Sequence, residues 1–182
     1  MESLNKDHPH LSVDFLVTDK MLEGPCAQER YGVSSICFGC GPAQPLGLKV
    51  RTFEVLGQSE SGFVTVAKWH PEPHHAAFPG MLNGGIIGAI LDCHSNWTAA
   101  LALRQRLNLE SAPCTVTSSF KITLLKPTPS QGVVTLRAVP HSIEKDRFVV
   151  IHATLEAGGV ITATCEGLFV AVKEGHPAYH RW

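Results

Sequence analysis

One long apolar segment, residues 84–106, limits the possible folds of this chain more than any other feature. Its sequence, GGIIGAILDCHSNWTAALALRQR, is long enough for about six turns of helix. Apolar residues occur on every side of such a helix, which predicts burial on most sides. The polar residues between Asp92 and Asn96 argue against a membrane span. The rest of the chain must therefore supply a partner that surrounds this helix.

Six other segments have the β-branched enrichment or the alternation that is typical of strands. Two precede the helix and four follow it, with turns such as PTPSQG and EAGG between the later ones. Six strands in series can form an antiparallel sheet that curves around one helix. This order predicts an α+β fold, with one long central helix wrapped by a curved antiparallel sheet of five to six strands. The predicted strands cover residues 48–55, 62–69, 114–126, 132–143, 147–157 and 160–172.

Two stretches outside these strands are less regular. HPEPHHAAFPGM, residues 70–81, contains three prolines and is predicted to be a loop. VDFLVTDKML, residues 13–22, is compatible with either a short strand or a short helix.

The length and charge of the chain exclude several classes of protein. Its 182 residues have the size of one domain. The net charge is -1 and no basic run is present, so nucleic acid is not expected as a partner. The first residues lack the apolar region of a signal peptide, and a cytoplasmic location is expected. We predict an N-terminal extension over residues 1–46, a domain over 47–175 and a tail over 176–182.

The six cysteines are scattered, which does not suggest a disulfide framework in a chain of this length. Cys93, Cys114 and Cys165 lie in apolar segments and are predicted to be buried thiols. Cys37 and Cys40 form a single CxxC within CFGCGPAQPLGL. A structural zinc site needs four N or S ligands and no second CxxC is present, so no metal site is predicted. The residues that could complete one only through long-range folding are His8, His10, Cys26, His74 and His75.

The stretch FPGMLNGGIIGAILD at the helix start and the stretch TVTSSFKITLLKPTP after it resemble those of a known family. They are similar to the hotdog-fold acyl-CoA thioesterases, in particular the phenylacetyl-CoA thioesterase-like group of the 4-hydroxybenzoyl-CoA thioesterase superfamily. The resemblance covers residues 37–173, and CFGCGPAQPLGL resembles an N-terminal signature of one subgroup. It implies a hotdog fold and hydrolysis of an acyl-CoA to a carboxylic acid and CoA. Coenzyme A is then part of the substrate, and no cofactor is implied.

The glycines at the head of the helix and the acid in its middle are the candidate catalytic residues. The first N–H groups of a helix are unpaired and partly positive, and glycine lets a ligand approach them closely. The resemblance implies that the N–H of Gly84, with Gly85 beside it, binds the thioester carbonyl oxygen. It also implies that Asp92 is the general base or the nucleophile. The alternatives are glycines that only permit a tight turn, and an Asp92 held in a structural hydrogen-bond network with the backbone or Asn96.

The spacing of Gly84 and Asp92 leads to a further expectation. Eight residues at about 1.5 Å of rise each separate them by roughly 12 Å along the helix axis. One chain therefore cannot bring both groups to the same carbonyl. A two-fold dimer with antiparallel helices forms two shared sites, so a homodimer or a dimer of dimers is expected.

Three further positions are compared with those of relatives. The resemblance implies that Thr117 holds the attacking water. Asn83 stands where many relatives have a histidine; its amide can donate a hydrogen bond but cannot take up a proton. Ala77 stands where some relatives have an asparagine that binds the carbonyl, and His74 or His75 could substitute for it.

The two ends of an acyl-CoA need different surroundings. The phosphates of CoA need positive charge, and the resemblance implies a basic residue at a strand start, here Lys145 or Arg147. Arginine can bind a phosphate with two parallel hydrogen bonds. The acyl group is expected between the helix and the sheet, where Phe78, Met81 and Trp97 are the predicted lining residues.

Two other functions remain open on the sequence alone. Asn83 and Ala77 could leave a protein that binds acyl-CoA or lipid without turnover. Hotdog hydratases and dehydratases pair a loop histidine with an acid on the helix, and HHAAFPG offers histidines. The NGG…D arrangement fits the thioesterases better.

Overall fold

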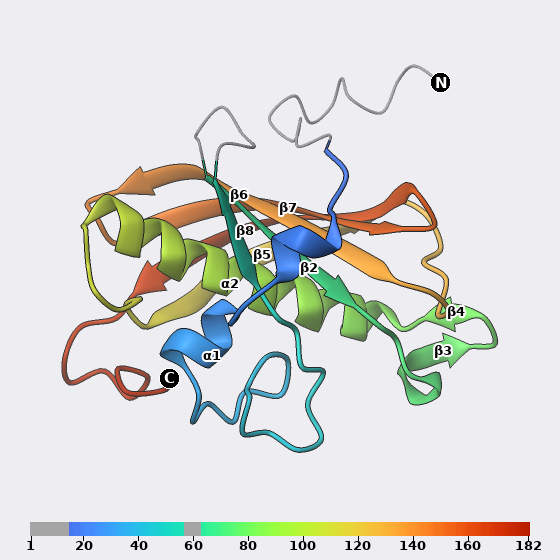
Figure 1. Ribbon diagram of the computed structural model, residues 1–182, viewed down its shortest axis with the longest axis horizontal. Coiled ribbons are helices and arrows are strands. Elements are labelled where there is room, and N and C mark those ends of the chain that lie inside the picture. The colour runs from blue at the N-terminus through green and yellow to red at the C-terminus, as the bar shows by residue number, and fades with distance from the viewer. Residues whose placement is uncertain (1–14, 57–62) are drawn as a thin grey trace.

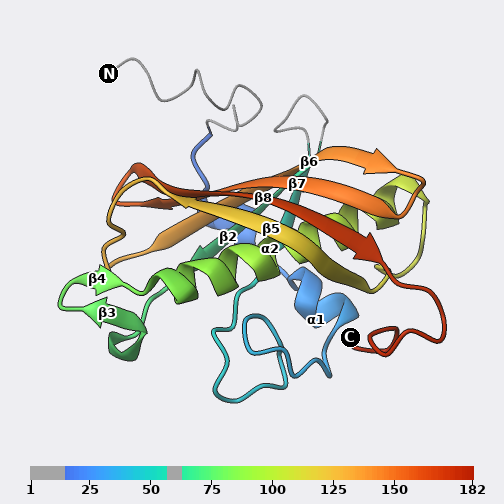
Figure 2. The same cartoon turned by 180° about the vertical axis from the view of Figure 1, so that it is seen from behind.

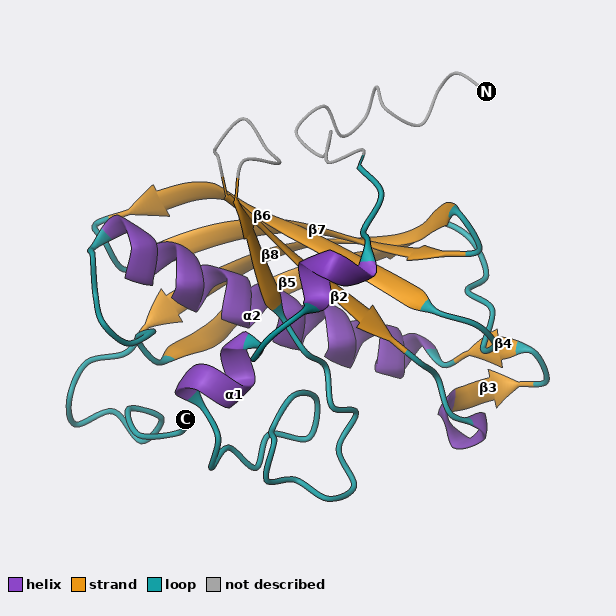
Figure 3. Ribbon diagram, viewed as in Figure 1, coloured by secondary structure: helices purple, strands orange, loops and turns teal. Residues whose placement is uncertain are grey.

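The computed structural model describes residues 15–56 and 63–182, which form one main antiparallel sheet around one long helix (Figure 1). The sheet has six strands in the order β1-β2-β6-β7-β8-β5, and every neighbouring pair is antiparallel. The predicted α+β fold is therefore confirmed, and Figure 3 shows its helices and strands by colour. The elements are β1 (Phe53–Leu56), β2 (Phe63–Trp69), α2 (Gly84–Arg106), β5 (Thr115–Leu124), β6 (Val134–Glu144), β7 (Phe148–Ala157) and β8 (Val160–Ala171).

Helix α2 is buried because it lies between two layers (Figures 1 and 2). One side contacts β2, β5, β6, β7 and β8 of the sheet. The segment 27–50, which includes the short helix α1 (Ala27–Tyr31), runs along the other side in both views. Among the described helices, α2 alone is long and apolar enough to cross a membrane, and 78% of its most apolar window is buried inside the fold. Contact on both sides accounts for the apolar residues all round the helix.

A segment in the first part of the described chain and its C-terminal end both add to this core. Ala27 and Cys40 belong to the same buried apolar cluster as residues of α2. The N–H of Ala27 donates to the carbonyl of Thr52 at 2.9 Å. At the other end, the ring of Trp182 packs on that of Trp97, with centroids 4.0 Å apart. The last residues of the chain therefore lie against the middle of α2.

Some local predictions differ from the structure. The strand predicted over 48–55 begins only at Phe53, because Lys49 adopts a left-handed conformation (φ 57) and the preceding segment bonds to the CxxC turn instead. The predicted loop 70–81 contains a 3-10 helix, η2 (Pro73–His75), and a small hairpin of β3 (Ala76–Phe78) and β4 (Met81–Leu82). Within 13–22, the structure has a 3-10 helix, η1 (Asp19–Leu22), and residues 13 and 14 lie outside the described residues.

A bulge in β5 sets which of its side chains face α2. The register between β5 and β8 shifts between Thr117 and Ser119. Before the bulge the odd-numbered Thr117 faces the helix, and after it the even-numbered Ile122 and Leu124 do. Without the extra residue, either the threonine or the two apolar side chains would point away from α2.

Candidate active site

The start of α2 is capped by Asn83 in a way that leaves one N–H group without a partner. The Oδ1 of Asn83 accepts hydrogen bonds from the N–H groups of Gly85 (2.7 Å) and Ile86 (3.3 Å). Asparagine is favoured at this position because it can make such bonds. No hydrogen bond within the described part of the chain involves the N–H of the exposed Gly84. The group predicted to bind a carbonyl oxygen is available, and the oxygen of Asn83 serves the cap.

Asp92 lies in the middle of α2 and meets Thr117 of β5. The Thr117 hydroxyl donates to Oδ1 of Asp92 at 2.8 Å. Asp92 is half-buried, whereas the eleven residues that follow it are buried. Its second carboxylate oxygen has no partner among residues 15–56 and 63–182. The structure thus brings together the two side chains that were predicted to act together.

A chain of hydrogen bonds behind Thr117 fixes the direction of its hydroxyl. Nδ2 of Asn96 donates to the Thr117 oxygen at 3.3 Å, which leaves the hydroxyl proton for Asp92. Oδ1 of Asn96 accepts from Thr115 (2.6 Å) and from Arg181 (3.3 Å), and these donors fix the orientation of the amide. The alternative of a direct hydrogen bond from Asp92 to the backbone or to Asn96 is not found among the described residues, and Asn96 is linked to Asp92 through Thr117.

Asn96 and Arg181 were not predicted as site residues. Asn96 follows Asp92 by four positions, which places the two side chains on one face of the helix. That spacing was a usable signal. Arg181 comes from the C-terminal tail, and no local pattern in the sequence marks it.

The surroundings of Asp92 favour its neutral form. Burial raises the pKa of Asp92, and the nearby Cys37 acts in the same direction. The hydrogen bond from Thr117 and the charge of Arg181 lower the pKa and oppose the effect of burial. A carboxylate whose pKa is raised is a stronger base than an exposed one, so the site suits proton uptake from a water molecule.

His75 is buried in the loop that precedes α2 and stabilises that loop. Its side chain is 6% exposed, and Nδ1 accepts a hydrogen bond from the N–H of Glu72 at 2.9 Å. Its carbonyl accepts from the N–H of Asn83 at 3.0 Å, and its ring lies 5.0 Å from that of Trp69. Burial lowers the pKa of His75. These contacts hold the loop at the start of α2, and substrate binding by His75 stays a prediction.

Two predicted acyl-group residues lie on the β3–β4 hairpin beside the helix start (Figure 1). Phe78 is 62% exposed and Met81 is half-buried. Trp97, the third, is 1% exposed and packs on Trp182 in the core. The hairpin therefore offers an apolar surface near Gly84, while Trp97 is part of the fold.

The two predicted CoA-binding residues line an open pocket of about 360 Å³, together with Lys173. Nε of Arg147 donates to the carbonyl of Ala171 at 2.8 Å, which holds the side chain in the pocket. The adjoining turn is joined to the end of α2 by an ion pair of 2.7 Å between Arg106 and Asp146. Fourteen residues, or about 21 Å along the helix, separate Arg106 from Asp92.

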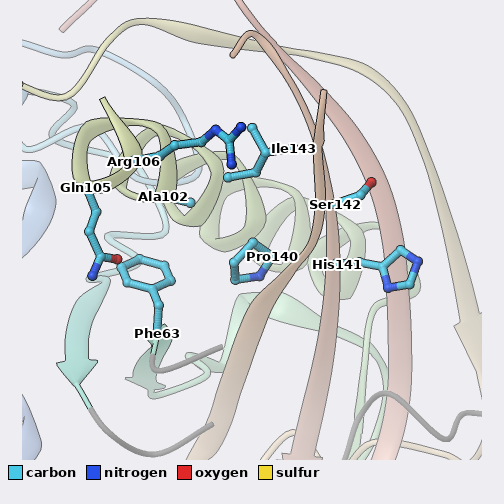
Figure 4. Close-up of a pocket in the computed structure, with 8 residues that line it drawn as sticks. All are labelled: Phe63, Ala102, Gln105, Arg106, Pro140, His141, Ser142 and Ile143. Atoms are coloured by element: carbon cyan, nitrogen blue, oxygen red, sulfur yellow. The ribbon is translucent and has the colours of Figure 1, made fainter. Parts of the chain in front are cut away.

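A second pocket, of about 300 Å³, opens at the same end of α2 (Figure 4). It lies between the last turns of the helix and β6. None of the predicted site residues lines it. Its lining residues are Phe63, Ala102, Gln105, Arg106, Pro140, His141, Ser142 and Ile143.

The structure also brings Cys93 of α2 to the CxxC turn. The sulfur atoms of Cys37, Cys40 and Cys93 all lie within 4.8 Å of one another. Cys93 was expected only as a buried thiol, and the partners considered for the CxxC did not include it. Of those partners, Cys26, His74 and His75 are not part of this group, and His8 and His10 lie outside the described residues.

Comparison with solved structures places the fold of this chain in a known family. A scan against protein-family models and a search of curated proteins each find no match. Among solved structures, a thioesterase superfamily protein from Shewanella loihica PV-4 is 30% identical to this chain, with a TM-score of 0.51. The match covers 60% of this chain and 84% of that protein. The chain belongs to the hotdog-fold thioesterase superfamily.

More distant structures share the fold of this superfamily member. A thioesterase from Haemophilus influenzae is 16% identical and matches 71% of this chain and 84% of its own, with a TM-score of 0.57. A phenylacetic acid degradation-related protein from Ralstonia eutropha JMP134 is 18% identical, with a TM-score of 0.50. That match covers 59% of this chain and 76% of the Ralstonia protein. At these identities the likeness concerns the fold alone. The hotdog fold implied by the sequence resemblance is confirmed.

Proposed function

We propose that this superfamily member is an acyl-CoA thioesterase in which Asp92 acts on the thioester. The observation that carries the proposal is the hydrogen bond from Thr117 to a half-buried Asp92, whose second oxygen has no partner in the part of the chain that the structure describes. The same helix begins at Gly84, whose N–H also has no partner among the described residues. Thioester hydrolysis needs a base beside the attacking water and a donor for the developing oxyanion, and these two groups supply them.

In the general-base route, the free oxygen of Asp92 takes a proton from a water molecule as the water oxygen attacks the thioester carbon. The carbonyl oxygen becomes negative and binds the N–H of Gly84 at the start of a second subunit's helix. The intermediate then releases CoA as a thiolate, which takes the proton from Asp92. Thr117 keeps the carboxylate oriented throughout. The products are a carboxylic acid and CoA.

In the nucleophilic route, Asp92 attacks the carbon itself and expels CoA as a thiolate, which leaves an anhydride; water then attacks the Asp92 carbonyl carbon of that anhydride, releases the carboxylic acid and gives a proton to the thiolate. A single turnover in ¹⁸O-labelled water separates the two routes. Label that enters Asp92, detected by mass spectrometry of its peptide, supports the nucleophilic route. Label found only in the carboxylic acid after one turnover supports the general-base route.

The proposal requires a homodimer or a dimer of dimers, because Gly84 and Asp92 are about 12 Å apart along one helix. Strand β5 supports such an assembly. It is an edge of the sheet, ten residues long, and Phe120 and Leu124 on it are 47% and 57% exposed. Long apolar edges are normally covered in native proteins. Two copies paired through β5 about a two-fold axis would place their α2 helices antiparallel.

The CoA phosphates are assigned to the pocket that Lys145, Arg147 and Lys173 line. The acyl group is assigned to the apolar surface of the β3–β4 hairpin, where Phe78 and Met81 lie. This places the two ends of the substrate on opposite sides of the reacting thioester.

A second candidate function, acyl-CoA binding without turnover, is favoured by one observation. Ala77 has no polar side chain, and Asn83, which its oxygen holds in the helix cap, cannot donate a proton as a histidine could. The donors left near the helix start are the N–H of Gly84 and the amide nitrogen of Asn83. Fewer donors mean weaker stabilisation of the oxyanion.

The test is CoA release, followed with a thiol reagent over a panel of acyl-CoAs. Asp92→Asn should lower turnover at least about a hundredfold, the typical contribution of a general base. Ser118→Ala, which removes a neighbouring exposed hydroxyl of β5, is the matched control and should keep wild-type turnover. No hydrolysis together with tight binding by calorimetry would identify a binding protein, and hydration of an enoyl-CoA would identify a hydratase. An Asp92→Asn variant as active as the wild type would exclude Asp92 as the catalyst.

A further inference from the structure

The three sulfur atoms of Cys37, Cys40 and Cys93 have the spacing of ligands around one metal ion. Cys37 and Cys93 are 3.7 Å apart, and no pair exceeds 4.8 Å. A tetrahedral zinc ion binds thiolates at about 2.3 Å, which puts neighbouring sulfurs roughly 3.8 Å apart. The ligands come from two distant parts of the chain, the CxxC turn and the middle of α2.

The turn is built for this close approach. A Cβ on Gly39 would lie only 2.3 Å from the Cys93 sulfur, and one on Gly41 only 2.4 Å from the carbonyl oxygen of Ser35. The N–H of Gly41 donates to the carbonyl of Cys37 at 2.8 Å and closes the turn. Glycine is required at both positions, because a side chain at Gly39 would collide with Cys93 of α2 and one at Gly41 would collide with the backbone of the turn itself.

A hydrogen-bond donor lies beside one of the sulfurs. The indole N–H of Trp97 donates to the sulfur of Cys40 at 3.3 Å. Such outer donors orient the ligands of metal sites and stabilise thiolate charge.

The cluster is closed on one side and open on the other. Cys40 and Cys93 are 3% and 8% exposed, whereas Cys37 is half-buried. Within the described residues, no fourth His, Cys, Asp or Glu side chain belongs to the group. Three protein ligands leave one position for a water molecule, and the side of Cys37 gives the ion a way in.

We propose that Cys37, Cys40 and Cys93 bind one zinc ion as thiolates, with water as the fourth ligand. Thiolate-rich tetrahedral sites select zinc over hard cations such as Mg²⁺. Each bound thiol gives up its proton to solvent, and no electron is transferred. The ion fastens the CxxC turn to α2 at the residue that follows Asp92. The site does not depend on the proposed thioesterase activity.

The first test is the metal content of tag-free protein purified without a metal-affinity step. Elemental mass spectrometry should find about one zinc per chain, and Cys37→Ser and Cys93→Ser should each lower this at least about fivefold. Cys114→Ser, which removes a cysteine outside the cluster, is the matched control and should keep the zinc. Zinc content unchanged in both cluster variants would overturn the proposal.

A second measurement needs no variant and covers the case in which the serine variants do not fold. Wild-type protein reconstituted with Co²⁺ should show thiolate-to-cobalt charge transfer and the visible bands of a tetrahedral ion. X-ray absorption of the zinc form should give three sulfur ligands at about 2.3 Å. Wild-type protein without metal, whose intact mass is lower by two hydrogens through a disulfide within the cluster, would contradict the metal site. Neither measurement uses catalytic activity, so failure of the zinc proposal can be distinguished from failure of the proposed thioesterase function.

Discussion

Replacing Gly84 by proline should remove one hydrogen-bond donor while leaving α2 intact. Gly84 is the first residue of the helix, where proline is favoured because its missing N–H has no helical partner. Asn83 before it has φ -67 and ψ 133, within the region that a residue preceding proline prefers. An added Cβ meets only the Leu124 side chain, at an ordinary 3.5 Å. The variant therefore tests the N–H itself.

Gly84→Pro should lower turnover about a hundredfold to a thousandfold, the usual loss for one oxyanion donor. Asp92→Asn should be similarly inactive. When the two variants are mixed, each mixed dimer joins an intact Asp92 from one subunit to an intact Gly84 from the other. Random exchange makes half of the dimers mixed, with one working site in two, so about a quarter of wild-type activity should return.

The assay is CoA release after the two variants are unfolded and refolded together, compared with each variant refolded alone. Gly84→Ala keeps the N–H and adds the same Cβ, so it is the matched control and should stay active. Size-exclusion chromatography and circular dichroism establish that dimers form and that the helix is retained. A mixture as inactive as its parents, under conditions where subunits exchange, would refute the shared site.

Three other changes have distinct expected outcomes. Thr117→Val removes the hydrogen bond to Asp92 and should lower kcat about tenfold to a hundredfold, the value of a bond to a charged group, with Ser118→Ala unaffected in the same assay. Arg147→Ala should raise KM for acyl-CoA several-fold in steady-state kinetics, and should leave unchanged the KM for a pantetheine thioester that lacks the phosphates. Burial lowers the pKa of His94 from 6.5 to about 4, so the unfolded chain binds the proton first as pH falls. Urea denaturation should therefore show about 2 kcal/mol less stability at pH 5 than at pH 7, and His94→Gln should lose this part of the pH dependence.

The main elements of the fold were predictable because their patterns reflect their surroundings directly. The helix over 84–106 is apolar on all sides, and in the structure it has the sheet on one side and the segment 27–50 on the other. The β-branched strands after it alternate because one face packs on the helix. What could not be predicted depends on single conformations, such as the left-handed Lys49 that delays β1, and the bulge after Thr117 that changes the facing side chains of β5.

The pairing of Asp92 with Thr117 was predictable from the resemblance, and Asn96 was accessible from its helical spacing. Two long-range contacts beside Asp92 were not. Arg181 reaches Asn96 from the C-terminal tail across 85 positions of sequence, and Cys93 reaches Cys37 across 56. Contacts between such distant residues leave no periodic signal, because nothing in the intervening residues has to repeat.

The properties of Asp92 therefore depend on the C-terminal tail, which no sequence pattern marks, as well as on β5. Burial raises the pKa of Asp92, whereas the hydrogen bond from Thr117 of β5 and the charge of Arg181 in the tail lower it. The two contacts therefore offset part of the effect of burial. Arg181 is held in place because the neighbouring Trp182 packs on Trp97 of α2. Loosening the tail would remove one opposing charge and leave burial in place. The pKa of Asp92 would then rise further, without any change in the residues that touch the substrate.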